Sequence, residues 1–508
     1  MAEDNTNCSN KVDFFKGADF FHGVFNYLNK MLMEEDDLAT KPCMLTNSLA
    51  LQATEKSFYD VLVDSNNNNN NNHYSFYSGQ ETKRLELQDY DAAVLCADLN
   101  NLWLDKTCSS ASLINHGNAR RKRRKGDVES VDLSELLTRC AAMVACSEIT
   151  EANQILKTIR KHSSPNGSSS KRLAHYFANA IEARLSGNGA EVYRGFSSTT
   201  ISGAQILTSY KAYIAACPFH RMSNIFANKS IWKLAIGRDK LHVVDFGILY
   251  GFQWPCIIEG LSMRPGGPPK LRITGIDFPQ PGLRPAGRVE ETGCRLAEYA
   301  KRFNVPFEYN SIAKNWENIA IEDLKIDPEE MLVVNSIYRM RNVLDETVVE
   351  HPPRDAVLKF IRKLKPDMFV HGVLNGAYNA SYFLSRFRHA IFHFTALFDM
   401  LEATTSKSED EDRKLIEQEV FGRDIMNAVA CEGRSRVERP ETYQEWDRRN
   451  SKAGFVKQPL NSGLMDEITR KVEKHYHKDF MVHEDDKWML QGWKGKVLYA
   501  LSLWTTES

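Results

Sequence analysis

A short stretch of the 508-residue chain has the residue types of a cofactor-binding turn. In LHVVDFGILYGFQWP, residues 241–255, an apolar run typical of a buried strand ends in Asp245, and Gly247 and Gly251 follow at once. In an open α/β sheet a ligand binds beyond the carboxyl ends of the strands, where glycines let the backbone approach it closely. A second apolar run ends in Asp277, where an acid would meet a ribose hydroxyl. Placement alone therefore predicts a site for a nucleoside cofactor such as S-adenosylmethionine.

Bulky side chains in the same turn argue against a working cofactor site. Leu249 stands where a D-x-G-x-G-x-G turn has its middle glycine, and its side chain would occupy cofactor space. Aromatic residues add further bulk, namely Phe246, Tyr250, Phe252 and Trp254. The apolar run at 331–337 ends in NSIYRM and lacks the Asn/Asp-Pro-Pro-aromatic run of amino methylation. We therefore expect a filled, structural turn without catalytic or cofactor-binding residues, and the alternative is a methyltransferase or small-ligand site across 245–251.

Several histidines have spacings that deserve a test as metal ligands. His389 and His393 lie four apart in RHAIFHF, so both would face one side of a helix, but no third ligand is near in sequence. His475 and His477 would suit two ligands on a strand, yet His483 is not followed by the HExxH spacing. We expect these histidines to lie in the core, at its rim or on the surface. We expect no metal site.

The pattern of apolar residues predicts the sheet that would position these residues. Four apolar, β-branched runs are separated by helical patterns, at 241–246, 271–277, 331–337 and 367–373. Such alternation predicts a methyltransferase-like, Rossmann-type α/β fold with a mostly parallel sheet and helices on both faces. The segment WMLQGWKGKVLYALSLW predicts a strand pair that turns at Gly495 and forms an antiparallel edge.

A helical region precedes the sheet, from residue 131 to about 235, with breaks at 163–170 and 187–189. Its first helix has Asp132 as amino-terminal cap, with Glu135 three residues later. One face carries an apolar stripe, Leu133, Leu136, Leu137, Cys140 and Val144. This stripe either completes the helical cap of its own body or lies in the groove of another protein.

The first 125 residues have a different composition. Residues 1–119 contain an asparagine run at 66–72 and carry a net charge of −9, which predicts a disordered acidic arm. DYDAAVLCADLNNLWL, at 89–104, mixes acids with apolar residues, as segments that fold on a partner do. A basic run follows, made of Arg120, Arg121, Lys122, Arg123, Arg124 and Lys125. It predicts a nuclear-import signal, and the alternatives are a solvated linker or a contact to nucleic-acid phosphates.

Composition excludes several other classes of protein. The sequence has no run of about 18 apolar residues, which a membrane-spanning helix needs, and no basic-then-apolar start typical of secretion. The ten cysteines include no CxxC pair, so we expect no zinc ribbon or redox motif. The part of the chain after residue 125 carries a net charge of only +2, and it contains no helix-turn-helix or zinc-finger pattern. We therefore do not expect strong binding to duplex DNA. Direct affinity for DNA could still come from a local groove.

Several motifs together resemble the GRAS family of plant transcriptional regulators over residues 131–508. The family's VHIID motif is similar to Leu241, His242, Val243, Val244 and Asp245. Its PFYRE region has an arginine–glutamate part that RVERPETYQEW resembles through Arg436 and Glu438. Its tryptophan-rich SAW end is similar to Trp488, Trp493 and Trp504. LDETV at 344–348 and the segment 375–401 resemble the scarecrow-like subgroup, although Ser381 replaces a usual proline.

The resemblance divides the body into five regions. They are leucine-rich region I at 131–190, the VHIID region at 210–275, leucine-rich region II at 291–323, the PFYRE region at 333–429 and the SAW region at 432–508. It implies a methyltransferase-like core with a helical cap, no established catalysis, and residence in the nucleus. It also implies binding to DNA-binding transcription factors, including the bZIP class. It further implies association with family members and recognition by a nuclear import receptor.

Overall fold

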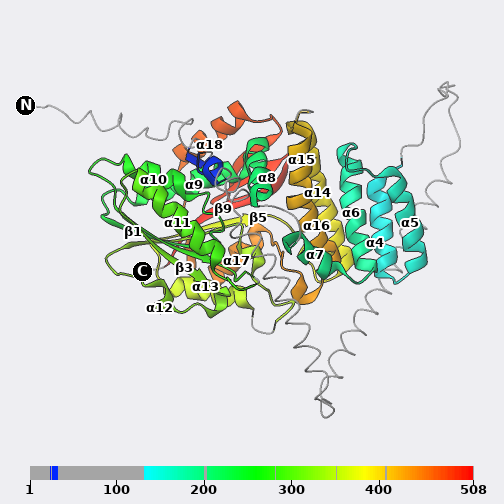
Figure 1. The fold of residues 1–508 in the computed structure, drawn as a ribbon, viewed down its shortest axis with the longest axis horizontal. Helices are drawn as coiled ribbons and strands as arrows, with labels where there is room; N and C mark the ends of the chain where they lie inside the picture. Colours follow the sequence, from blue (N-terminus) through cyan, green and yellow to red (C-terminus); the bar gives the residue numbers. More distant parts are fainter. Residues whose placement is uncertain are drawn as a thin grey trace, which may run out of the picture.

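The computed structural model describes residues 23–24, 26–31, 131–198, 203–280, 282–349, 352–406 and 409–506. In this part of the chain a nine-stranded sheet carries helices on both faces, and a helical bundle lies at one end (Figure 1). The strands are β1 (Lys240–Phe246), β2 (Lys270–Asp277), β3 (Phe307–Ala313), β4 (Met331–Ile337), β5 (Met368–Leu374), β6 (Phe455–Lys457), β7 (Phe480–Asp485), β8 (Trp488–Trp493) and β9 (Lys496–Thr506).

The sheet has the order β3-β2-β1-β4-β5-β9-β8-β7, and β6 pairs with β9. Strands β1 to β5 are parallel, whereas β9, β8 and β7 follow in antiparallel pairing. The four predicted parallel strands correspond to β1, β2, β4 and β5, with boundaries shifted by at most one residue. The predicted methyltransferase-like α/β class is confirmed.

Two details differ from the sequence-based expectation. Strand β3 was missed because its segment, FEYNSIA, is polar and half-buried on the outside of the sheet. The predicted strand pair with its turn at Gly495 is present as β8 and β9, and Gly495 has φ of +80°. The pair is not the edge, however, because β7 pairs outside β8 and β9 lies between β5 and β8.

Helices divide into those that cover the sheet and those that form the bundle. Their bounds are α4 (Leu133–Ala145), α5 (Ile149–His162), α6 (Ser169–Leu185), α7 (Gly189–Ser198), α8 (Gly203–Ala216), α9 (Phe219–Leu234), α10 (Trp254–Ser262), α11 (Gly287–Arg302), α12 (Ile321–Leu324), α13 (Pro353–Lys363), α14 (Phe383–Thr404), α15 (Asp410–Ile416), α16 (Arg423–Ala430), α17 (Tyr443–Lys452) and α18 (Ser462–His475). Helices α9, α10, α11 and α18 lie on one side of the sheet, and α12, α13 and α17 lie on the other (Figure 1). In the bundle, α6 packs against α4, α14 and α16, so the predicted helical cap also includes helices that follow the parallel strands in the chain.

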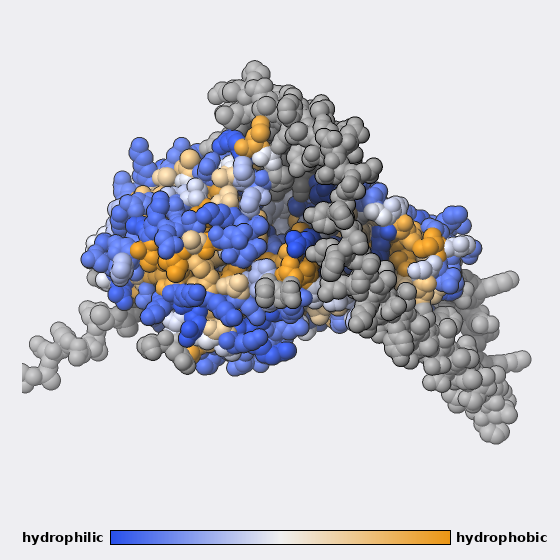
Figure 2. Space-filling view, turned by 90° about the horizontal axis from the view of Figure 1, so that it is seen from below, coloured by the Kyte–Doolittle hydropathy of each residue, from blue (hydrophilic) through white to orange (hydrophobic). Residues whose placement is uncertain are grey.

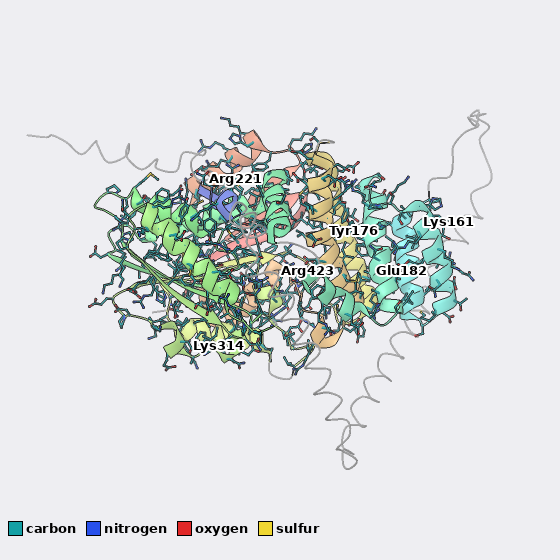
Figure 3. The ribbon with its side chains drawn as sticks, in the orientation of Figure 1. Lys161, Tyr176, Glu182, Arg221, Lys314 and Arg423 are labelled. Carbon is teal, nitrogen blue, oxygen red and sulfur yellow. The ribbon has the colours of Figure 1, made fainter. Side chains whose placement is uncertain are left out.

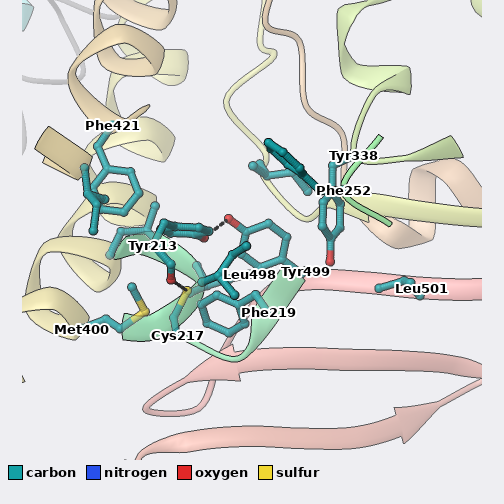
Figure 4. Close-up of a cluster of buried hydrophobic side chains, with 14 of the residues drawn as sticks. Tyr213, Cys217, Phe219, Phe252, Tyr338, Met400, Phe421, Leu498, Tyr499 and Leu501 are labelled. Atoms are coloured by element: carbon teal, nitrogen blue, oxygen red, sulfur yellow. Dashed lines mark hydrogen bonds between the residues drawn. The ribbon is translucent and has the colours of Figure 1, made fainter. Parts of the chain in front are cut away.

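The core has an aromatic centre where the bundle meets the sheet. Tyr213 and Tyr499 share a hydrogen bond between their hydroxyls, 2.7 Å apart, and Phe219 packs against the ring of Tyr499 with centroids 4.8 Å apart (Figure 4). By contrast, the face of the molecule in Figure 2 is largely hydrophilic, with apolar side chains gathered in patches. Among the described residues no helix is long and apolar enough to cross a membrane.

Within the arm that we expect to be disordered, over residues 1–119, one short segment has a described structure. Residues 23–24 and 26–31, which we call the amino-terminal helix, are helical and pack against the body. Their apolar residues repeat at helical spacing, a signal that the acidic composition of the arm obscured. The basic run at 120–125 and the acidic–apolar stretch at 89–104 lie outside the described residues.

Candidate functional site

The turn after β1 lies at the switch point of the sheet. Strand β1 pairs with β2 on one side and with β4 on the other, and ligands of open α/β sheets bind at such a point. The turn is tied to β2 because the amides of Gly247 and Ile248 both donate to the carbonyl of Ile276, at 2.9 and 3.1 Å. The turn that the sequence analysis singled out therefore lies where ligand sites of such sheets occur.

The glycines of this turn make room for protein side chains. Gly247 has φ of +105°, and a Cβ there would lie 2.3 Å from Cγ of Arg339. Gly251 has φ of +71°, and a Cβ there would lie 2.9 Å from Cγ2 of Thr292. Between them Leu249 takes φ of +50°, a conformation that costs a leucine about 1–2 kcal/mol, and its carbonyl accepts a hydrogen bond of 2.7 Å from the Thr292 hydroxyl. Arg339 and Thr292 thus hold the turn where a cofactor would need space.

The carboxylate of Asp245 is likewise bound by the protein. Its Oδ2 accepts from Trp254 Nε1 at 2.8 Å and its Oδ1 accepts from Asn335 Nδ2 at 2.9 Å. Asn335 is bound in turn by Gln253, which also donates to Asn228 at 3.0 Å. Burial raises the pKa of Asp245 to about 7, although the hydrogen bonds from Asn335 and Trp254 lower it. The acid therefore anchors the start of α10.

The second acid, Asp277, is held in the same way. Its Oδ2 accepts from Arg288 of α11 at 2.6 Å from Nη2 and 3.0 Å from Nε. Its Oδ1 accepts from the amide of Phe278 at 2.9 Å and lies 3.7 Å from Nη2 of Arg339. Asp277 is 2% exposed, so the place of a ribose hydroxyl is taken by a guanidinium. The partners of both acids are therefore side chains and backbone amides of the protein itself.

The remaining residues of the VHIID motif are buried in the sheet. Leu241 and Val243 face one core cluster and Val244 faces the other. His242 shares a 2.8 Å hydrogen bond between Nε2 and the Thr274 hydroxyl, and its Nδ1 lies 3.3 Å from Glu330 Oε2. Burial lowers the pKa of His242 to about 4, so the imidazole is neutral near pH 7 and links β1 to β2.

A buried network of charges lies beside the mouth, at the carboxyl end of β4. Arg341 binds Asp424 of α16 at 2.9 Å and Glu438 at 2.9 Å. Burial works against ionisation of Glu438, but Arg341 and Arg339 outweigh it, so the pKa of this carboxyl is lowered. The neighbouring Arg423, which lies between the sheet and the bundle in Figure 3, covers the Tyr193 ring at 5.3 Å.

Of the two predicted residues, Glu438 belongs to this network, whereas Arg436 lies in a neighbouring one that contains Asn379. Arg436 donates to Asn379 Oδ1 at 2.9 Å, and burial lowers the pKa of its guanidinium to about 9. Arg439, which the sequence did not single out, binds Asp345 at 3.2 Å and donates to the carbonyl of Arg436 at 2.8 Å. Asp345 lies in the LDETV motif, so that motif was the available signal, whereas no pattern marked Arg341 or Asp424.

The three predicted tryptophans are buried, and each indole has a hydrogen bond. Trp488 donates to Asp447 at 2.9 Å, Trp493 to Asp399 at 2.7 Å and Trp504 to the Ser502 hydroxyl at 2.7 Å. Trp488 and Trp504 pack edge to face on one side of the sheet, while Trp493 faces the other core cluster. The three tryptophans therefore contact the core clusters on both sides of the sheet.

The apolar stripe of α4 lies against its own bundle. Leu133, Leu137 and Cys140 are buried, while Leu136 and Val144 are half-buried and pack against the same core. Asp132 caps the helix as expected, because its Oδ1 accepts from the amides of Ser134 and Glu135 at 2.9 and 3.1 Å. This placement favours the structural interpretation of the stripe over a docking face.

The predicted histidines do not converge on a metal. His393 is buried in the core and His389 is exposed on the same helix. His475 and His483 are exposed, and His477 is half-buried. Within the described ranges no three His, Cys, Asp or Glu side chains form a group that would hold a metal ion.

Comparison with known proteins gives consistent relatives. The sequence profile of the GRAS domain family matches residues 133–505. Scarecrow-like protein 14 of Arabidopsis thaliana is 52% identical over 381 residues, which are 75% of this chain and 49% of that protein. Scarecrow-like protein 30 of the same plant is 43% identical over 521 residues, 95% of this chain and 89% of that protein. The chain spans about half the length of the first two curated relatives.

A solved structure gives the same result for the fold. The crystal structure of SCL7 from Oryza sativa superposes with a TM-score of 0.61 at 26% sequence identity. It covers 74% of this chain and all of that chain. The α/β core with its helical cap is therefore shared with a plant protein of known structure.

Proposed function

The chain belongs to the GRAS domain family, and on that premise we propose that it is a nuclear regulator of transcription that acts through contacts with DNA-binding transcription factors. The bZIP class is the partner class that we test first. Association with other family members and recognition of residues 120–125 by an import receptor are parts of the same proposal.

The observation that most supports a non-catalytic role is the way the switch-point mouth is filled. Trp254 and Asn335 donate hydrogen bonds to the two carboxyl oxygens of Asp245, and Arg288 donates to Asp277. A methyltransferase must leave these acids open to a nucleoside and its amino-acid part. Here they are used to fix α10 and α11, so the fold offers a stable body on which partners bind.

The charge distribution supports indirect contact with DNA. The part of the chain after residue 125 carries a net charge of only +2. Many arginines of the body form buried ion pairs, as Arg341 and Arg439 do. Duplex binding depends on lysine and arginine side chains that neutralise phosphates. A protein of this kind gains its position on DNA more readily from a partner than from its own surface.

A reporter assay in plant protoplasts tests the regulatory proposal. The full chain is expressed with a bZIP factor, and the reporter is driven by that factor's binding site. We expect reporter output to change only when the chain, the factor and an intact site are all present. The same change without the factor would assign direct DNA binding to this chain and would contradict the proposal.

Calorimetry with S-adenosylmethionine tests the enzymatic alternative. We expect the full chain to give no binding heat at millimolar cofactor. Micromolar binding that Asp245→Ala abolishes, and that the exposed control Asp239→Ala keeps, would restore the methyltransferase interpretation.

A further inference from the structure

The amino-terminal helix lies on the same turn that fills the cofactor mouth. Val24, Tyr27, Leu28 and Met31 are at most 4% exposed, and their spacing places them on one helical face. Asn26 and Asn29 are exposed. In Figure 1 this helix, in blue, lies beside α9 and α10. A segment from the acidic arm therefore covers an apolar part of the body.

The surface beneath this helix is specific in shape and in polarity. The Tyr27 ring packs edge to face on Phe252 and Tyr299, with centroids 6.3 and 5.7 Å apart. Its hydroxyl donates to the carbonyl of Tyr250 at 3.2 Å. At the start of the helix a Cβ on Gly23 would lie 2.8 Å from Glu259 Oε1, so only glycine fits there without displacing that carboxylate.

Polar contacts at the rim fix the direction of the helix. Lys30 pairs with Glu298 of α11 at 2.6 Å, and Lys211 of α8 donates to Asn29 Oδ1 at 3.0 Å. Arg295 and Arg302 line a hollow beside Met31, at the carboxyl end of the helix. In the sequence, four acids follow shortly after Met31, namely Glu34, Glu35, Asp36 and Asp37. The contacts of Lys30 and Asn29 therefore tie the rim of the helix to α11 and α8.

The connection to the body makes this contact resemble binding rather than core packing. About 100 residues separate Met31 from Val131, where the described body begins. The entropic cost of closing a loop rises only slowly with its length, so a separation of this many residues does not prevent docking in cis. A short helix with one buried face that belongs to the same chain acts as an intramolecular ligand, present at high effective concentration.

We propose that the surface formed by Tyr250, Phe252, Glu259 and Tyr299 is a docking site for a short amphipathic helix, and that residues 23–31 occupy it in cis as an exchangeable ligand. The ligand chemistry is a glycine, then valine, tyrosine, leucine and methionine at helical spacing, followed by acids. Release of the helix exposes both this surface and an acid-flanked apolar helix that suits a partner's groove. The docking is independent of whether the chain regulates transcription.

A peptide-exchange experiment tests this proposal in the full chain. The probe is a fluorescent peptide of residues 18–37, and its anisotropy is followed as each chain is added. Leu28→Asp charges the buried face, whereas Asn26→Asp adds the same charge to the exposed face two residues away. We expect the Leu28→Asp chain to bind the peptide at least ten-fold more tightly than the wild type or Asn26→Asp, because the cis helix competes in the latter two.

The other outcomes overturn the proposal. Equal or absent peptide binding in a Leu28→Asp chain that melts like the wild type would show that the surface is no docking site. General unfolding of Leu28→Asp would assign the helix to the permanent core. Exchange of the helix between two copies would make the wild type sediment as a dimer and Leu28→Asp as a monomer, which would overturn the cis arrangement.

Hydrogen exchange on the unmodified chain gives a second measurement. An exchangeable ligand opens locally, so the amides of residues 26–31 are expected to be protected at least 100-fold less than those of β1. Equal protection of the two segments would mean that the helix leaves only when the whole body unfolds, and the proposal would fall.

Discussion

Trp254 donates its indole N–H to Asp245, nine positions earlier in the chain, with 2.8 Å from Nε1 to Oδ2. The acid near the end of β1 and the residue that begins α10 are therefore joined inside the core. This hydrogen bond occupies one oxygen of the Asp245 carboxyl within the protein. Its contribution to stability can be measured.

The first prediction concerns this hydrogen bond. Trp254→Phe keeps an aromatic ring but leaves one buried oxygen of Asp245 without its donor, which should lower the free energy of unfolding by about 1–3 kcal/mol. Trp316→Phe is the matched control, because Trp316 is equally buried and its Nε1 has no hydrogen-bond partner among the described residues. Urea unfolding of both variants checks the prediction, and equal losses would contradict it.

The second prediction concerns pH. Burial lowers the pKa of His220 and His242 to about 4 and that of His371 to about 3. Unfolded histidines bind protons near pH 6.5, so the unfolded state gains protons first, and stability should fall as pH is lowered from about 6.5 to about 4. Asp245 acts with the opposite sign, because its raised pKa of about 7 makes its contribution fall as pH rises from about 4 to about 7.

Asp245→Asn isolates the contribution of the acid. Without that carboxyl, stability should rise more steeply with pH between about 4 and 7, by at most roughly 1.4 kcal/mol per pH unit relative to the wild type. Unfolding free energies at several pH values give both curves. Parallel curves would mean that Asp245 is ionised in the fold throughout this range.

The third prediction concerns Gly247. Alanine there combines an unfavourable positive φ with a Cβ that meets Arg339 at 2.3 Å. Gly237→Ala is the control, since Gly237 has φ of +75° and its Cβ would meet nothing within 4 Å. We expect a loss of about 1–2 kcal/mol for Gly237→Ala and a further ~1–3 kcal/mol for Gly247→Ala, by thermal or urea unfolding. Similar losses would show that Arg339 moves aside without cost.

The fourth prediction concerns the buried charges. Arg341→Met leaves Asp424 and Glu438 together without their shared cation, which should cost roughly 3–5 kcal/mol of stability. Lys270→Met breaks the exposed pair with Glu308 and should cost less than about 1 kcal/mol. If both variants unfold at the same urea concentration, the network does not hold α16 to the sheet.

The fifth prediction concerns import. Replacing all six residues 120–125 by alanine should move a fluorescent fusion of the full chain towards the cytoplasm, because an import receptor would lose its row of cations. Microscopy gives the nuclear fraction, and circular dichroism of the purified variant should be unchanged. Unaltered nuclear accumulation would leave the run as a linker or show entry with a partner.

The sequence predicted the parallel strands well because their apolar runs leave few alternatives. Leu249 led to the expectation of a filled turn, but Arg339 and Thr292, which the structure places against Gly247 and Gly251, carried no signal in the sequence. The partners of the acids could not be predicted, because Asn335 and Arg288 reach Asp245 and Asp277 only through sheet pairing and helix docking. The amino-terminal helix was missed because four apolar residues in an acidic arm are a weak signal.

The position of β9 has a consequence for synthesis of the chain. Because β9 lies between β5 and β8, residues 496–506 fill the middle of a sheet whose parallel half precedes them in the chain. Until these residues leave the ribosome, β5 keeps an unpaired apolar edge, which is the kind of surface that chaperones bind and that aggregates. A product that stops short of residue 496 would thus be a substrate for quality control rather than a smaller folded protein.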